Sequence, residues 1–86
     1  MSEQVHLAFI ILAPGGASTN ARSDNGFTLT LATVDTIEAA VQLTRNLTGQ
    51  GVTNIELSAG FGDDGLAEIR KVAGTGVRVG RVRYEP

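Results

Sequence analysis

Residues 5–13, VHLAFIILA, form a nearly continuous apolar run that ends at Pro14, Gly15 and Gly16. Such a run suits a central β-strand that is covered on both faces of its sheet. At about nine residues it is too short to span a bilayer as a helix. Glu3 precedes it and no Lys or Arg does, so the positive region of a secretion signal is missing. We therefore interpret the run as a buried strand and expect no membrane partner.

The chain has 86 residues, and we expect them to form one small domain, residues 1–86, with a modest core. It contains no cysteine, which excludes disulfides, thiolate metal sites and cysteine nucleophiles, and which fits a cytoplasmic location. The formal net charge is -2, so no global field attracts nucleic acid or an anionic membrane. We expect no cofactor, no metal site and no nucleic-acid partner.

Strand-like and helix-like segments follow the apolar run. The small and polar residues 14–26 are typical of an exposed loop, and FTLTLAT, residues 27–33, alternates as a strand with one wet face does. Apolar periodicity, an Asp35 N-cap and glycine stops predict the remaining elements: a helix ending at Gly49, a strand Val52–Ser58, a helix ending at Gly74 and a strand Val77–Tyr84. The expected fold is a small α/β domain in β-β-α-β-α-β order, with a four-stranded, mostly parallel sheet and two helices.

The order of these elements predicts much of the topology. Two consecutive β-α-β units make the last three strands parallel, joined by right-handed crossovers, while the first strand can pair in either direction. The carboxyl ends of the parallel strands then share one edge of the sheet, where open α/β sheets bind ligands. Residues 58–65 lie at that edge.

Gly60, Gly62 and Gly65 have the G-x-G-x-x-G spacing of a dinucleotide-binding turn between a strand and a helix. However, Asp63 and Asp64 occupy the positions after Gly62, and two carboxylates at a helix N-terminus repel a pyrophosphate. The spacing therefore does not indicate a phosphate site. Two interpretations remain: a tight structural turn in which one of the two Asp residues caps the helix, or a small-ligand site.

In the ligand interpretation, carboxylates and open backbone amides face a neutral or cationic group of the ligand. The candidate ligand-binding residues are Ser58, Gly60, Phe61, Gly62, Asp63 and Asp64. In the structural interpretation, the same residues only turn the chain.

Glu56 is an unusual residue for a short strand, because it points opposite Ile55 and Leu57. If that side is covered, its carboxylate must pair, accept hydrogen bonds or stay protonated, and such a group can serve as a catalytic acid or base. The alternative is an ion pair with Arg81 or Arg83 of the neighbouring strand, or a solvated sheet face.

The first strand has apolar side chains on both faces, so both faces of the sheet around it require cover. Two helices cannot supply both if consecutive crossovers place them on the same side. We therefore expect a homo-oligomer, most simply a two-fold dimer, to cover the other face.

Three stretches, AFIILAPGG, IELSAGFGDDGLAEI and VGRVRYE, resemble a family of small, uncharacterised bacterial α/β domains. Its pattern comprises an AFI-x-x-AP strand, an IE-x-x-GGFG turn and a closing V-G-x-V-R strand. The resemblance implies that Glu56, Gly60, Phe61 and Gly62 belong to the family pattern. Ser58 and Ala59 replace the Cys and Gly that are common there, which argues against thiol chemistry. The resemblance implies a fold and no established activity.

Two functional hypotheses follow. The first is an oligomeric, non-catalytic module that binds a small polar ligand at the strand-to-helix turn, residues 58–64. The alternative is a small cofactor-independent enzyme that uses Glu56 as a general acid or base, with amides around Gly60 and Gly62 stabilising negative charge. The hypotheses differ in whether Glu56 opens into a pocket beside the turn or is closed in an ion pair.

Overall fold

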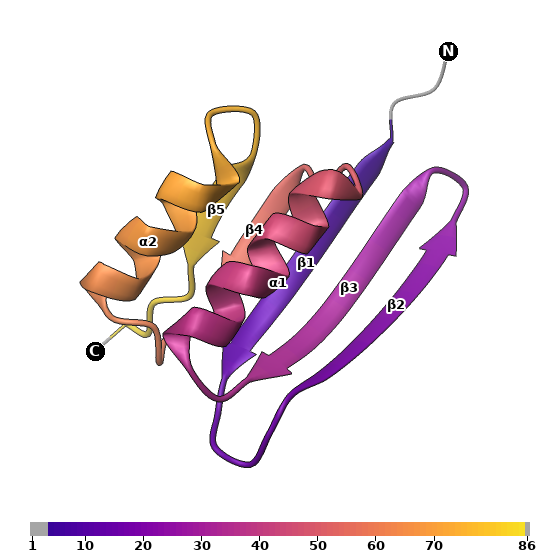
Figure 1. Ribbon diagram of the computed structural model, residues 1–86. Coiled ribbons are helices and arrows are strands. Elements are labelled where there is room, and N and C mark those ends of the chain that lie inside the picture. Colours follow the sequence, from indigo (N-terminus) through magenta and orange to yellow (C-terminus); the bar gives the residue numbers. More distant parts are fainter. Residues whose placement is uncertain (1–3, 86) are drawn as a thin grey trace.

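The computed structural model describes residues 4–85. It is an α/β domain in which a five-stranded mixed sheet carries two helices (Figure 1). The elements in chain order are β1 (Val5–Leu12), β2 (Ser18–Asp24), β3 (Phe27–Val34), α1 (Ile37–Gly49), β4 (Asn54–Leu57), α2 (Asp63–Ala73) and β5 (Arg78–Arg81).

The strands lie in the order β2-β3-β1-β4-β5. The central strand, β1, pairs parallel with both β3 and β4, and β5 pairs parallel with β4. The predicted central position of the apolar run and the mostly parallel sheet are therefore confirmed. The direction of the first strand, which the sequence left open, is parallel to β3.

The sheet has five strands, so the prediction of four was wrong. The additional strand, β2, lies in the segment that was interpreted as a loop, and it pairs antiparallel with β3. Every residue of β2 is exposed, so its sequence lacks the apolar alternation that marks a half-buried strand. The turn between the two strands places Asn25 and Gly26 at φ 51° and 83°, as an Asn-Gly hairpin turn requires.

The core lies between the helices and one face of the sheet. It contains apolar side chains from both layers, namely Ala8, Ile10, Val34, Ala40, Leu47, Val52, Ile55, Leu57, Phe61, Ile69 and Ala73. The helices also contact each other: a Cβ on Gly65 of α2 would lie 2.9 Å from Cδ1 of Ile37 of α1. Thr36, rather than the predicted Asp35, is the N-cap of α1, and its hydroxyl accepts a hydrogen bond from the amide of Ala39 at 3.0 Å.

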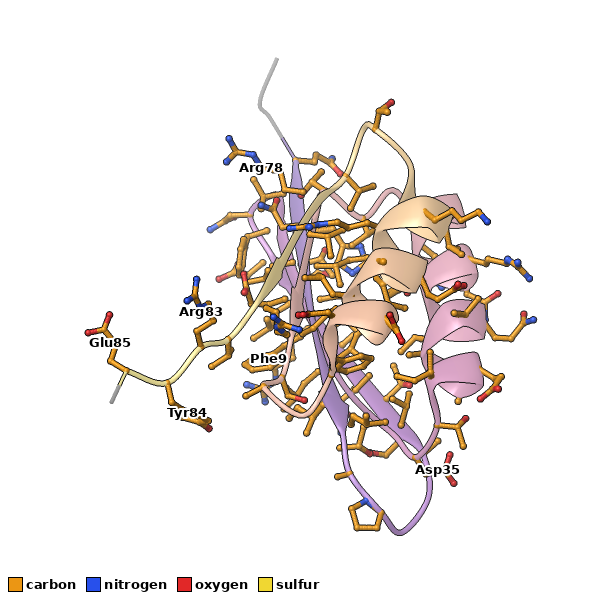
Figure 2. All side chains as sticks on the ribbon, turned by 90° about the vertical axis from the view of Figure 1, so that its left-hand side faces the viewer. Phe9, Asp35, Arg78, Arg83, Tyr84 and Glu85 are labelled. Atoms are coloured by element: carbon orange, nitrogen blue, oxygen red, sulfur yellow. The ribbon has the colours of Figure 1, made fainter. Side chains whose placement is uncertain are left out.

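Both helices cover the same face of the sheet, as the two crossovers predict (Figure 1). We call the other face the open face. Its strands present alternating side chains away from the helices: Val5, Leu7, Phe9 and Ile11 from β1, Phe27, Leu29 and Leu31 from β3, and Asn54 and Glu56 from β4. Seen along the sheet, Phe9 and Arg78 lie on the side away from the helices (Figure 2).

The open face is markedly apolar. Phe27 is 45% exposed, Leu29 39% and Leu31 48%. Within residues 4–85, no helix is both long and apolar enough to cross a bilayer.

Candidate functional site

The glycine turn connects β4 to α2 at the carboxyl ends of the parallel strands, as predicted. Helix α2 begins at Asp63, with Gly62 as its N-cap and no side chain capping it. The expected capping role of Asp63 or Asp64 was therefore wrong. Both instead lie in the first turn, where their negative charge complements the helix dipole.

Hydrogen bonds within the domain hold the turn against β1. The hydroxyl of Ser58 accepts a hydrogen bond from the amide of Leu12 at 3.0 Å, and the amide of Ser58 donates to the carbonyl of Ile10 at 3.0 Å. The amide of Phe61 donates to the carbonyl of Ser58 at 3.2 Å, and the side chain of Phe61 is buried in the core. Two of the candidate ligand-binding side chains, those of Ser58 and Phe61, are thus engaged in structural contacts.

Arg81 ties the turn to β5. Its guanidinium lies 2.9 Å from a carboxylate oxygen of Asp63 and also donates to the carbonyl of Phe61 at 3.1 Å. The sequence interpretation allowed Arg81 as a partner of Glu56, but the two side chains lie on opposite faces of the sheet. Arg81 is in register with Leu57, which faces the helices, whereas Glu56 is one residue earlier on β4.

The remaining candidates at the turn, Gly60, Gly62 and Asp64, are exposed. Neither Gly60 nor Gly62 has a positive φ, so their backbone conformations are ones that other residues also adopt. A Cβ on Gly60 would lie 3.5 Å from the carbonyl oxygen of Leu12, an ordinary contact. The geometry of the turn is therefore that of a well-anchored strand-to-helix connection.

Glu56 lies on the open face and is half-buried, in register with Phe9 on one side and Gly80 on the other. Its carboxylate extends over Gly80: a Cβ built there would be 3.0 Å from Oε1 and 3.3 Å from Oε2. The ion pair found among residues 4–85 joins Arg81 to Asp63 and does not involve Glu56. Glu56 therefore points away from the helices, neither closed by a cation nor directed into a pocket shared with the turn.

A hollow that the sequence did not predict lies at the β2–β3 side of the open face. Its volume is about 510 Å³ and its lining residues are Arg22, Ser23, Asp24, Phe27 and Leu29. The apolar alternation of residues 27–33 was visible in the sequence, but the charged lining comes from the strand that was interpreted as a loop. Only the hairpin pairing places Arg22 beside Leu29 and Asp24 beside Phe27.

The sequence matches the Family of unknown function (DUF6506) over residues 5–86. No curated protein and no solved structure matches it. The match extends over nearly the whole chain and agrees with the resemblance to a family without established activity.

Proposed function

We propose that this chain, which belongs to the Family of unknown function (DUF6506), is a self-associating module that binds a small polar ligand on the open face of its sheet. The observation that supports the proposal is the hollow of about 510 Å³ over Phe27 and Leu29. Ligand pockets commonly measure roughly 300–1,000 Å³ and combine an apolar lining with a few polar groups. Here Arg22 and Asp24 supply those groups.

The hollow favours a ligand that carries both charges on an apolar body. Arg22 and Asp24 lie two residues apart on β2 and on the same face, because they are in register with Leu29 and Phe27. Their Cα atoms are therefore about 7 Å apart. A guanidinium binds a carboxylate and a carboxylate binds an ammonium group, so the matching class is a small zwitterion such as an apolar amino acid.

Thermal unfolding with leucine as the probe tests the proposal. A ligand at ten times its Kd adds about 1.4 kcal/mol to the stability of the folded state. In a domain of this size, that raises the Tm by roughly 5–10 °C. We expect leucine to act more strongly than 3-methylbutylamine or 4-methylpentanoate, each of which lacks one charge. No shift with any of the three compounds at millimolar concentration would refute the proposed ligand class.

Matched variants locate the site. Arg22→Gln and Asp24→Asn should each abolish the leucine shift, whereas Arg45→Gln and Asp35→Asn, exposed residues outside the hollow, should retain it. Asp64→Asn tests the glycine turn in the same assay. Loss of the shift in Asp64→Asn, with Arg22→Gln unaffected, would move the ligand to the turn.

A second candidate function, a cofactor-independent enzyme using Glu56, is supported by the half-buried position of that residue on the open face. Glu56 lies on β4, on the other side of β1 from the hollow, so a reacting ligand would have to extend across β1. Incubation of binding compounds with the protein and with Glu56→Gln, followed by mass spectrometry of the products, separates the two functions. Turnover that disappears in Glu56→Gln supports the enzyme; unchanged ligands support the binding module.

A further inference from the structure

We infer that a second copy of this chain covers the open face, with the two sheets packed antiparallel and Glu56 of each copy paired with Arg78 of the other. The inference rests on the self-association included in the proposed function and is independent of the ligand.

The side chains of the open face form rows across the sheet, because residues in register on neighbouring strands share a face. The Leu7 row contains, from β2 to β5, Arg22, Leu29, Leu7, Asn54 and Arg78. The Phe9 row contains, in the same order, Asn20, Leu31, Phe9, Glu56 and Gly80. Each row therefore has an apolar centre with polar side chains on both sides of it.

The open face has the area that a dimer needs. The strands β1 to β5 contain eight, seven, eight, four and four residues. With a rise of about 3.3 Å per residue and a strand spacing of about 4.8 Å, they cover roughly 500 Å² for each copy. Two copies together bury about 1,000 Å², the size at which specific protein interfaces begin. Leu31 at the centre of β3 is 48% exposed, and Phe27 and Leu29 on the same side of that strand are 45% and 39% exposed. A contiguous exposed apolar stripe of this kind is a feature of interaction surfaces.

We consider a two-fold axis that lies between the two sheets, perpendicular to the strands, and passes between the Leu7 row and the Phe9 row. It places the Leu7 row of one copy opposite the Phe9 row of the other. Leu7 of one copy then lies opposite Phe9 of the other, and Leu29 lies opposite Leu31. The centre of the interface is apolar and self-complementary, as a two-fold interface requires. The same arrangement places Phe27, which lines the hollow, opposite Thr33 of the other copy. Each copy therefore covers the hollow of the other.

The charged side chains of Arg78 and Glu56, on β5 and β4, select this orientation. Arg78 lies opposite Gly80 of the other copy, where the absent side chain leaves room for the carboxylate of Glu56 that extends over it. The guanidinium of Arg78 in each copy thus lies beside the carboxylate of Glu56 in the other, and the dimer contains this ion pair twice. Glu56 is therefore paired with a cation when the second copy removes it from solvent. A two-fold axis running along β1 would instead place Arg22 opposite Arg78, which is repulsive.

The chain beyond β5 supports a partner on this side. Arg83, Tyr84 and Glu85 leave the sheet away from the helices and extend on the side of the open face (Figure 2). Tyr84 in this segment is 85% exposed. A second copy on the open face would provide an apolar surface for that aromatic ring.

Sedimentation equilibrium across a concentration series tests the inference. We expect a species of twice the 9.0 kDa chain mass at micromolar concentrations. Leu31→Asp should abolish it, and Arg78→Glu should raise the dimer Kd at least tenfold because it faces Glu56. The double variant Glu56→Arg/Arg78→Glu should recover most of the wild-type affinity, whereas Arg45→Glu on α1 should leave the Kd unchanged.

Circular dichroism and the Tm establish that each variant is folded. If Glu56→Arg disturbs the packing over Gly80, the single variant Arg78→Glu still tests the interface, because Arg78 is exposed. A wild-type monomer at 50 µM would overturn the inference. So would a dimer that tolerates Leu31→Asp, or a double variant that fails to recover affinity. If the protein dimerises but leucine does not raise its Tm, the proposed ligand would be overturned and the dimer would stand.

Discussion

The two faces of the sheet consist of side chains from the same strands, but the helices cover only one of them. On the helix-covered face, Ile10, Ile55 and Leu57 are at most 1% exposed. On the open face, Leu29 and Leu31 are 39% and 48% exposed. The difference arises from the connections between the strands. Helices α1 and α2 belong to two successive right-handed crossovers, β3 to β4 and β4 to β5, which run in the same direction across the sheet and therefore place both helices on the same side. Strand alternation therefore defines the two faces, and the crossovers decide which one the chain itself covers.

The largest expected difference between the faces concerns side-chain truncation. Leu57→Ala should lower the free energy of unfolding by about 2–5 kcal/mol, because it leaves a cavity in the core. Leu31→Ala, at a position 48% exposed, should cost less than about 1 kcal/mol in dilute solution. Urea unfolding at sub-micromolar concentration measures both. Equal losses would mean that the open face is covered within a single chain.

The concentration dependence of the same pair of variants sharpens the comparison. Cover by a second copy stabilises the folded state by mass action, so the loss caused by Leu31→Ala should grow as the protein concentration rises. The loss caused by Leu57→Ala should remain constant, since its contacts lie within one chain. A constant loss for both variants would argue against cover by another copy.

A smaller difference is expected for alanine in place of glycine on each face. Gly65→Ala puts a Cβ 2.9 Å from Ile37 and 3.3 Å from Phe61, inside the packed layer, and should cost about 1–3 kcal/mol. Gly80→Ala puts a Cβ 3.0 Å from Oε1 of Glu56, whose carboxylate is free to move away on the open face of the monomer that is present at sub-micromolar concentration. Its cost should be below about 1 kcal/mol by urea unfolding. A larger loss for Gly80→Ala than for Gly65→Ala would reverse the ranking of the two faces.

The smallest effect is expected at the ion pair beside the helix-covered face. Asp63→Asn removes the contact with Arg81 at 2.9 Å, but the Asp63 side chain is 93% exposed. The loss should be at most about 1 kcal/mol, and smaller still in 0.5 M salt, because solvent and ions screen exposed charges. Thermal unfolding at two salt concentrations measures it, with Asp64→Asn as the control in the same helical turn. A salt-independent loss above about 2 kcal/mol would mean that the pair anchors the turn.

Much of the fold could be predicted from the sequence. The unbroken apolar run gave the central strand β1, and helical periodicity with a final glycine gave α2 and its end at Gly74. The strand β2 was missed because all its side chains are exposed and its stability comes from backbone pairing with β3. Asn25-Gly26 was the one available signal, since this dipeptide favours the tight turns of hairpins.

The candidate site was predicted less completely than the fold. Its location at the carboxyl edge of the sheet followed from the chain order, but the partners of its residues did not. The hydroxyl of Ser58 binds the amide of Leu12, which is 46 residues away in the chain, and no local pattern encodes that contact. The hollow was missed for the same reason, since Arg22 reaches it only through the hairpin.

The sequence by itself determined four of the five strands, both helices and the order of these elements, because they depend on local periodicity and chain connection. Only the tertiary structure decided which charged groups meet. Arg81 pairs with Asp63, and Glu56 extends over Gly80 on the other face, because the register of β5 against β4 sets which side chains share a face. A shift of one residue in that register would exchange the two faces, and the sequence of a four-residue strand does not specify it alone.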